Sequence, residues 1–508
     1  CATPMPKSDC AGPRLPLHDT AATRRFETRA IARAPAGALM ARAGLAAAKL
    51  ALALRPDARR VWVLAGPGNN GGDGLDAAAR LQAAGRDVTV HLLADAQRQG
   101  ADARAARQRA QEAGVRLVDA LPDAPPSCDL AIDALLGLGL TRAPAGALEA
   151  AIAAFNATGA MRLAIDLPSG LDADRGATPG AAVQAQHTLT MLTLKPGLFT
   201  AQGRDHAGQV WLDALGEDVD EPPTAWLAAA AAEPPPARRH AQHKGSFGDV
   251  VVVGGAPGMV GAAWLAASAA LAAGAGRAYV SLLDPAAPAW LATRPELMSR
   301  ERAWADHPSL LRMSTVVCGC GAGAAVRQAL PVVLALAPRL VLDADALNAV
   351  AADEALQHAL GQRGPRGAAT VLTPHPLEAA RLLGRTAAQV QADRFGAAQA
   401  LAEAFGAVVV LKGSGTLVAA PSALPWVNLS GNAALASPGT GDVLAGWLGG
   451  EIAASGITTA SPQALQQRCA AVVARHGAAA DRHGDRTPLR AAALIEAMAE
   501  ASRAAPAA

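Results

Sequence analysis

The fold of the first half of the chain is decided by a strand and the loop after it, Val61-Trp-Val-Leu-Ala65 and Gly66-Pro-Gly-Asn-Asn-Gly-Gly-Asp-Gly74. The apolar run predicts a buried strand, and the next helix is expected from about Gly74. A strand, a glycine loop and a helix in this order are typical of open parallel sheets. The loop is therefore expected at the carboxyl end of a strand, where such sheets bind their ligands.

From this segment onward, short β-rich runs alternate with helical stretches that are rich in Ala and Leu. In the first half, strands are expected at residues 61–65, 88–93, 130–134 and 163–165, with a helix near 102–113. In the second half, strands are expected at 250–253, 280–283, 315–317, 340–342, 370–372 and 408–411. This alternation predicts two α/β units, each a parallel sheet with helices on both faces.

Proline and acidic residues cluster between the two series, in Asp218-Val-Asp-Glu-Pro-Pro and Glu233-Pro-Pro-Pro. Such clusters are typical of domain boundaries. We expect a first domain at residues 1–216, a linker at 217–239 and a second domain at 240–508. The alanine run 228–232 is either a short helix that begins the second domain or part of a flexible linker.

Composition excludes several classes of protein. With 51% hydrophobic and 17% charged residues, the 508-residue chain is not intrinsically disordered. A net charge of +2 gives no reason to expect nucleic acid or an anionic membrane as a partner. The six cysteines form no C-x-x-C pair, residues 1–28 lack the apolar core of a signal peptide, and the apolar stretch 261–276 is too short to span a membrane. We expect a cytoplasmic protein with reduced thiols.

The first glycine loop contains G-x-G-x-x-G from Gly66 onward, which is the fingerprint of dinucleotide binding. Asp73 argues against dinucleotide binding, because its carboxylate would lie where the negatively charged pyrophosphate of a dinucleotide should bind. Asn69, Asn70 and Asp73 instead offer amide and carboxylate oxygens, which suit a hard cation or the hydroxyl and amide groups of a ligand. The alternative for Asp73 is a helix cap.

Two more acidic residues end predicted strands. Asp133 precedes the loop Gly137-Leu-Gly139, and Asp166 opens Asp166-Leu-Pro-Ser-Gly170. Because the carboxyl ends of parallel strands share one edge, Asp73, Asp133 and Asp166 are expected to face one crevice.

These motifs, with Lys195-Pro-Gly197, resemble the NAD(P)H-hydrate epimerase domain, also called the YjeF N-terminal domain, over residues 15–215. The resemblance implies a Rossmann-like three-layer sandwich. It also implies that potassium (K⁺) is held by Asn70, Asp133 and Ser169. The substrate contacts that it implies are Asn69, Asn70, Gly71, Gly72, Asp73, Gly137, Leu138, Gly139, Leu140, Thr141, Arg142, Ala143 and Asp166.

Epimerisation of a hydrated nicotinamide needs a group that gives and takes a proton near the ring, and a carboxylate beside a cation can serve. We predict that Asp133 is this catalytic acid/base. Lys195 is a second candidate, with a solvated lysine before a Pro-Gly turn as its alternative.

The second domain carries Gly439-Thr-Gly441-Asp442 directly before an apolar helix. The amides at the start of that helix can face a transferring phosphoryl group, while Asp442 deprotonates the attacking hydroxyl. The alternative is a glycine-rich cap with Asp442 on the helix dipole.

Companion motifs occur in order: Asp343-Ala-Asp-Ala-Leu-Asn348, Thr373-Pro-His-Pro-Leu-Glu378 and Leu411-Lys-Gly-Ser-Gly-Thr416. The set resembles the ribokinase-like superfamily, and within it the ADP/ATP-dependent NAD(P)H-hydrate dehydratases, which implies an α/β/α domain. Magnesium (Mg²⁺) is expected with ADP or ATP. The implied nucleotide contacts are Lys412, Gly413, Ser414, Gly415, Thr416 and Gly441. The implied substrate contacts are Ala262, Gly321, Gly323, His375 and Asp442.

This sequence departs from that pattern at two places. Cys320 stands where Pro is usual in a Gly-Pro-Gly loop, and Ser437-Pro438 stand where Thr-Gly is common. Cys318 and Cys320 supply only half of a zinc site, which argues against a metal pair there.

Together the two resemblances imply one repair enzyme. It would interconvert the R and S hydrates of NADH and NADPH (NADHX and NADPHX), phosphorylate the C6 hydroxyl of the S form and eliminate phosphate. A homo-oligomer is expected. The alternatives are a vitamin-precursor kinase, a non-catalytic binding module in the first domain, and a dehydrogenase that uses the Gly66 loop.

Overall fold

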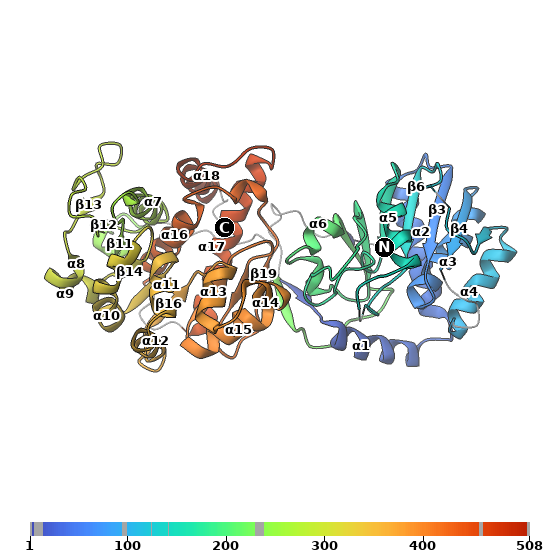
Figure 1. The fold of residues 1–508 in the computed structure, drawn as a ribbon, viewed down its shortest axis with the longest axis horizontal. Helices are drawn as coiled ribbons and strands as arrows, with labels where there is room; N and C mark the ends of the chain where they lie inside the picture. Colours follow the sequence, from blue (N-terminus) through green and yellow to red (C-terminus); the bar gives the residue numbers. More distant parts are fainter. Residues whose placement is uncertain are drawn as a thin grey trace. The chain divides into compact units, whose positions relative to one another are not determined.

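The computed structural model describes residues 3–4, 14–93, 99–122, 124–140, 142–228, 238–456 and 461–504. The chain divides into two compact units (Figure 1). It passes from the first to the second between Ala225 and Trp226. This point lies inside the stretch 217–239 that was predicted as a linker. Arg14 and Leu15, which the prediction assigned to the first domain, belong to the second unit.

The first unit is built on an eight-stranded sheet with the order β1-β9-β8-β7-β6-β3-β4-β5. All neighbours are parallel except β1, which runs antiparallel to β9. The strands predicted at 61–65, 88–93, 130–134 and 163–165 are confirmed as β3, β4, β6 and β7. The strands are β1 (Thr3–Pro4), β3 (Arg60–Ala65), β4 (Asp87–Leu92), β5 (Arg116–Val118), β6 (Leu130–Ala134), β7 (Met161–Ile165), β8 (His187–Met191) and β9 (Gln209–Asp213).

Helices cover both faces of this sheet, because successive side chains of a strand point to opposite sides. Val61 and Val63 of β3 lie in a core with α2 (Ala38–Leu54), α3 (Asn69–Ala83) and α4 (Ala101–Glu112). Trp62 and Leu64 lie in a second core with α5 (Ala147–Asn156). The unit is therefore a three-layer sandwich, as predicted. Its other helices are α1 (Thr20–Arg33) and α6 (Gly203–Ala207).

The glycine loop is shorter than the sequence predicted, since α3 begins at Asn69 rather than near Gly74. The reason is close packing between the segments that follow β3 and β6. A Cβ atom on Gly66 would collide with the carbonyl oxygen of Leu135, and one on Gly71 would collide with that of Gly66. Residues 69–73 therefore form the first turns of a helix whose start faces the end of β6.

The sheet of the second unit has the order β13-β12-β11-β14-β15-β16-β17-β18-β19-β10-β2, although only Leu15 of β2 is assigned to this unit. The run from β13 to β17 is parallel, whereas β18 is antiparallel to both its neighbours. The six predicted strands correspond to β11, β12, β14, β15, β16 and β17. The bounds are β2 (Leu15–Leu17), β10 (Ala225–Ala228), β11 (Asp249–Gly254), β12 (Arg277–Leu282), β13 (Met298–Ser299), β14 (Thr315–Cys318), β15 (Arg339–Leu342), β16 (Ala369–Leu372), β17 (Val408–Leu411), β18 (Leu417–Ala419) and β19 (Trp426–Asn428).

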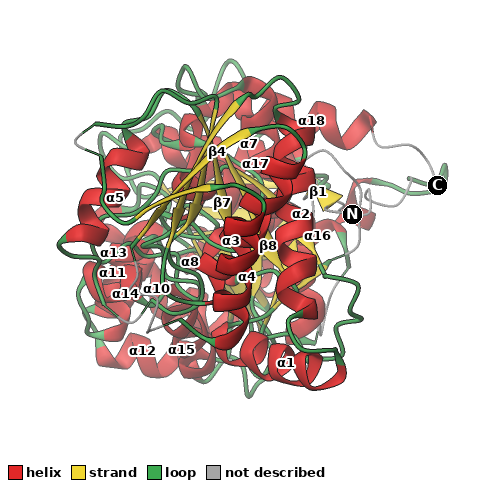
Figure 2. Ribbon diagram, turned by 90° about the vertical axis from the view of Figure 1, so that its right-hand side faces the viewer, coloured by secondary structure: helices red, strands yellow, loops and turns green. Residues whose placement is uncertain are grey.

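Helices also cover both faces of the second sheet. In Figure 2 the strands of the chain are yellow and the helices red. Four helices share one core with Val250 and Val252 of β11: α7 (Val260–Ala272), α16 (Thr440–Ala454), α17 (Pro462–His483) and α18 (Ala491–Ala504). Val251 and Val253 are equally buried, and α10 packs on β11 while α15 packs on β17. The remaining helices are α8 (Ala303–Asp306), α9 (Pro308–Met313), α10 (Val326–Leu336), α11 (Ala344–Ala351), α12 (Glu354–Gly361), α13 (Pro376–Leu383), α14 (Ala387–Ala392) and α15 (Arg394–Phe405).

Three further expectations concern helices. The apolar stretch predicted as a core helix is α7, and it is confirmed as part of the core. The helix considered for 228–232 does not begin at Ala228, which ends β10; residues 229–232 lie outside the described ranges. Among the described residues, no single helix is long and apolar enough to cross a membrane, although the bent pair α1–α2 passes that test together.

Candidate active sites

A cavity of about 430 Å³ lies at the carboxyl ends of β3, β6 and β7 in the first unit. The segments after these strands and after β8 contribute to its wall, together with the first turns of α3 and residues of α1 and α2. Parallel sheets form ligand sites at this edge, so the cavity lies where the sequence placed it. The predicted residues that line it are Asn69, Asn70, Asp73, Gly137, Leu138, Gly139, Asp166 and Lys195.

Some predicted contacts lie elsewhere. Gly71 and Gly72 belong to the buried side of α3 and are not part of the wall. Leu140 lines a smaller neighbouring cavity of about 220 Å³. Arg142 and Ala143 are exposed and line neither cavity, and Thr141 lies outside the described residues.

Asp166 and Lys195 form an ion pair in the cavity wall, with 2.6 Å between Lys195 Nζ and Asp166 Oδ1. The lysine side chain is 1% exposed and also donates to Thr190 Oγ1 and the carbonyl oxygen of Met191. Within the described residues, every hydrogen bond to the Asp166 carboxylate ends on Oδ1. Oδ2 is the oxygen next to Gly137, since a Cβ atom on that glycine would lie 3.2 Å from it. The pair thus fixes one carboxylate oxygen and presents the other to the cavity.

Asp133 lies behind this wall. Its side chain is fully buried and accepts hydrogen bonds from Ser169 N (2.8 Å), Ser169 Oγ (2.6 Å) and Leu135 N (3.1 Å). Burial raises the pKa of its carboxyl to about 6. The prediction that Asp133 exchanges protons with the substrate does not fit this position, because a carboxylate without exposed surface cannot touch a molecule in the cavity.

The three residues predicted to hold K⁺, Asn70, Asp133 and Ser169, are linked by hydrogen bonds through Leu136. Asn70 Nδ2 donates to the carbonyl oxygen of Leu136 (2.9 Å), and the amide of Leu136 donates to Ser169 Oγ (2.8 Å), which in turn donates to Asp133. Asn70 Oδ1 is buried and finds no hydrogen-bond partner among the described residues. A buried oxygen without a donor costs free energy, which a cation would offset.

Sequence reasoning missed the contribution of α1. Glu27 and Arg24 line the cavity from this helix. The pKa of Glu27 is raised, first by burial and then by the charge of Asp166. The pKa of Asp73 is raised well above its usual value, first by burial and then by Asp166 and Glu27. No local signal marks Glu27, because Asp166 and Lys195, two of the charged groups that act on it, lie more than a hundred positions away in the sequence.

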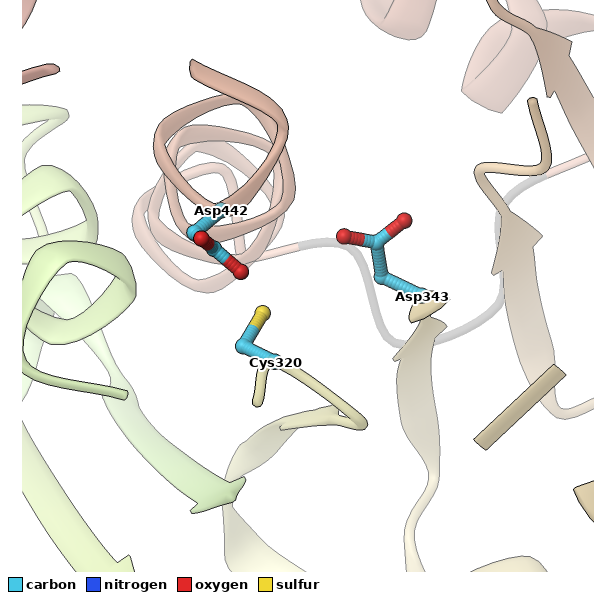
Figure 3. A group of neighbouring side chains, drawn as sticks. All are labelled: Cys320, Asp343 and Asp442. Carbon is cyan, nitrogen blue, oxygen red and sulfur yellow. The ribbon is translucent and has the colours of Figure 1, made fainter. Parts of the chain in front are cut away.

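The second site lies at the carboxyl ends of β14, β15 and β17. Cys320 follows β14, Asp343 follows β15, Lys412 follows β17, and Asp442 is the third residue of α16. Figure 3 shows the side chains of Cys320, Asp343 and Asp442 directed toward one another. Lys412 Nζ is 2.8 Å from Asp343 Oδ1, which also accepts a hydrogen bond from Thr373 Oγ1 (2.8 Å).

Asp442 lies at the start of α16, where amides lack partners inside the helix and carry positive partial charge. The first intrahelical bond runs from Val443 N to Gly439 O (3.0 Å). His476 bonds the carbonyl oxygen of Thr440 (3.0 Å), and burial lowers the pKa of this histidine to about 4, so it is neutral. Burial, and next the charge of Asp343, raises the pKa of Asp442 to about 6. A carboxyl with such a pKa is suited to general-base work near neutral pH.

The loop from Lys412 to Thr416 is held by Arg394, whose buried guanidinium donates to the carbonyl oxygens of Leu411 and Lys412 (3.3 Å each). Gly413 has φ +131°, which a residue with a side chain rarely adopts. The start of α16 abuts the loop, since a Cβ atom on Gly441 would be 3.6 Å from Lys412 Nζ. The predicted nucleotide residues Lys412, Gly413, Ser414, Gly415, Thr416 and Gly441 are thus brought together.

The predicted substrate residues of this unit meet only in part. A Cβ atom on Gly321 would be 2.8 Å from the Cβ of Ala262, so these two are neighbours. The amide of Gly323 donates to Asp345 Oδ2 (2.8 Å). His375 is half-exposed and caps α13, because its Nδ1 accepts from the amides of Leu377 and Glu378. Capping gives His375 a structural role beside the predicted contact with the substrate.

Comparison with known proteins finds one family model in each of the two units. Residues 36–197 match the family model of the YjeF-related protein N-terminus, and residues 250–500 match that of NAD(P)H-hydrate dehydratase. A bifunctional NAD(P)H-hydrate repair enzyme of Escherichia coli strain K12 is 39% identical over 458 residues, which cover 87% of this chain and 84% of that protein. One from Coxiella burnetii is 38% identical over 431 residues, covering 82% and 85%.

Among solved structures, the second unit is similar to an ADP/ATP-dependent NAD(P)H-hydrate dehydratase from Bacillus subtilis that was co-crystallised with ATP and Mg²⁺. The two are 27% identical with a TM-score of 0.44, and the match covers 53% of this chain and 94% of the other.

Proposed function

The chain belongs to the family of bifunctional NAD(P)H-hydrate repair enzymes, and we propose that its two sites divide the work, with epimerisation in the cavity of the first unit and dehydration at the start of α16. The observation that carries the proposal is that each unit holds its own carboxylate and lysine at the carboxyl edge of its own sheet. The substrates are the hydrates of NADH and NADPH, with ADP or ATP as the phosphoryl donor.

Dehydration begins at Asp442. This carboxylate takes the proton of the C6 hydroxyl as the hydroxyl oxygen attacks the terminal phosphorus of the nucleotide. Lys412 and the amides that open α16 stabilise the charge on the transferring phosphoryl group. Phosphate then leaves with the C6 oxygen, the ring nitrogen donates its lone pair, and loss of a proton from C5 restores the dihydronicotinamide.

Mg²⁺ fits the second site through the nucleotide, since this ion binds phosphates together with one or two carboxylates. Asp343, beside Lys412, offers such an oxygen. When bound, Mg²⁺ neutralises phosphate charge and so favours attack on the terminal phosphorus.

Epimerisation uses the Asp166–Lys195 pair. We assign to Asp166 Oδ2 the transfer of a proton to the C6 hydroxyl as it leaves, with the ring nitrogen forming an iminium. The same oxygen then takes a proton from the water that adds to the opposite face of the ring. Lys195 keeps Asp166 in place, because it is buried and holds Oδ1.

K⁺ fits the oxygens behind the cavity wall, because Asn70 Oδ1 is buried without a donor and Asp133 is a buried carboxyl. Asn70, Asp133 and Ser169 would hold the ion. When bound, it supplies a positive charge that stabilises the ionised form of Asp133 and attracts electron-rich groups of the substrate.

The test is recovery of the near-ultraviolet absorbance of dihydronicotinamide from a mixture of R and S NADH hydrate, with Mg²⁺ and either ADP or ATP. Full recovery is expected, and the nucleotide that supports the faster recovery identifies the donor. Recovery of the S fraction alone would contradict epimerisation in the first unit. A stable phosphorylated product without recovery would contradict dehydration and favour a vitamin-precursor kinase.

Three expectations from the sequence stay predictions: a homo-oligomer, a cytoplasmic location, and the absence of nucleic-acid and membrane partners. Sedimentation of the purified chain tests the first.

A further inference from the structure

Three side chains with metal-binding atoms meet at the start of α16. The Sγ of Cys320 and one carboxylate oxygen each of Asp343 and Asp442 lie within 4.8 Å of one another (Figure 3). We propose that these residues bind a thiophilic divalent cation, Zn²⁺ or Cd²⁺, and that this ion inhibits dehydration. The inhibition rests on the proposed role of Asp442, whereas binding of the ion does not.

The ligand atoms are close to the separation that such an ion requires. Zn²⁺ bonds sulfur at about 2.3 Å and carboxylate oxygen at about 2.0–2.2 Å, so neighbouring ligands in a tetrahedral site lie about 3.5 Å apart. The observed atoms, within 4.8 Å of one another, need to approach by at most about 1.3 Å to reach that separation. Rotation of the Asp442 side chain on the first turn of its helix supplies this movement. A water molecule would complete the four-coordinate site.

Two of the three ligands are held in place before any ion arrives. Cys320 is fully buried, and its backbone carbonyl oxygen accepts a hydrogen bond from Gly255 N (3.0 Å). Asp343 is 3% exposed, and Lys412 and Thr373 both bind its Oδ1. Oδ2 of Asp343 therefore remains for an ion without loss of either contact.

The donor set selects the kind of ion. A thiolate and two carboxylates suit Zn²⁺ and Cd²⁺, whereas Mg²⁺ prefers six oxygens in octahedral geometry. On binding, the Cys320 thiol gives its proton to solvent and its sulfur bonds the metal, so that three negative ligands face one divalent ion. Lys412 binds Oδ1 of Asp343, not the oxygen proposed to bind the ion. Its positive charge lowers the affinity for a cation without occupying the site.

The site depends on a residue that departs from the usual family pattern. Cys320 occupies the position at which the sequence departs from the Gly-Pro-Gly loop of the ribokinase-like pattern. Cys318, two positions earlier, is buried in β14 and is not part of the group. The site therefore combines Cys320 with Asp343 and Asp442, and does not use the pair of neighbouring cysteines.

Binding would remove Asp442 from catalysis, because a carboxylate that coordinates a metal cannot accept the proton of the C6 hydroxyl. Dehydration in the presence of Mg²⁺ and nucleotide should therefore fall as Zn²⁺ is added, while epimerisation in the other unit continues.

The test uses the full chain, reduced and freed of metal. Cd²⁺ is titrated without nucleotide, and the ultraviolet absorbance of cadmium–thiolate bonds is compared between the unaltered chain, Cys320→Ala, Asp442→Asn and the matched control Cys318→Ala. We expect Cys320→Ala to lose one equivalent of the signal and Cys318→Ala to keep it. Asp442→Asn retains the thiol and should bind at least about 10-fold more weakly.

Dehydration is then measured against buffered Zn²⁺, with chelation to reverse the effect. Equal cadmium signals in the unaltered chain and Cys320→Ala would overturn the site, as would equal inhibition of these two proteins by Zn²⁺. If the chain bound Cd²⁺ through Cys320 but never dehydrated the hydrate, the proposed function would fail while the metal site stood.

Discussion

Asp133 in the first unit and Asp442 in the second share a pKa of about 6, and burial is the first cause in both. Their surroundings differ. Asp133 is fully buried and accepts three hydrogen bonds from groups within the protein, whereas Asp442 is half-buried on the first turn of a helix. A raised pKa alone therefore does not identify a general base, because the carboxyl must also be able to reach the substrate.

The lysines of the two sites sharpen this contrast. In the first unit, Lys195 binds Asp166, the carboxylate that lines the cavity. In the second unit, Lys412 binds Asp343 and leaves Asp442 without an ion pair among the described residues. The first site thus fixes its proposed proton-transfer carboxylate through a contact with lysine, whereas in the second site burial is the first cause of the raised pKa of Asp442.

The largest effect is expected from Asp442→Asn. Loss of the general base should lower kcat for dehydration of the S hydrate by about 10²–10⁴-fold. Epimerisation should change less than about twofold, because the sites lie in separate units. The first is followed by absorbance and the second by chromatographic separation of the R and S forms. Equal loss of both activities would contradict two independent sites.

The next comparison is Asp166→Asn against Asp133→Asn. We expect the first to lower epimerisation about 10²-fold at saturating K⁺, because it removes the proton-transfer group. Asp133→Asn should retain more activity and lose its dependence on K⁺. Rates of R-to-S conversion over a series of K⁺ concentrations check this. The reverse order of the two losses would restore Asp133 as the acid/base.

K⁺ should also stabilise the chain through Asp133. A carboxyl pKa raised from 3.8 to about 6 in the folded protein lowers the free energy of unfolding as pH rises through that interval, by at most about 3 kcal/mol. A cation at Asp133 offsets this loss above pH 6. Thermal unfolding at pH 7 is expected to show a Tm that rises with K⁺ in the unaltered chain, but not in Asp133→Asn. The same rise in both proteins would place the ion elsewhere.

The smallest effect is expected from pH. Because Asp442 must be ionised to accept a proton, kcat/KM for dehydration should fall about 10-fold per pH unit below its pKa of about 6. Above that pKa the rate should level off. A profile taken with saturating nucleotide checks this, and a flat profile between pH 5 and 7 would show that Asp442 is not the base.

The sequence predicted most of the central strands, because their apolar runs are a local pattern. Strands that are buried on both faces of a parallel sheet consist almost entirely of apolar residues, which makes these runs easy to find. The predicted start of α3 near Gly74 was wrong, since the helix begins at Asn69. It begins early because Gly66 and Gly71 have no side chains and so allow the segments after β3 and β6 to pack closely. The sequence did not predict β18, β19 and β10, which are short and are identified by their neighbours in the sheet.

By itself, the sequence determined the order of the two α/β units and the segments that carry the chemistry, since glycine loops and strand-end acids are local patterns. Tertiary structure decided which side chains reach a ligand. It enclosed Asp133, placed Asp166 and Glu27 in one cavity, and brought Asp343 and Asp442 to Cys320. The physical reason is that access and pairing depend on residues from separate strands and helices, which only the packed sheet edges bring together.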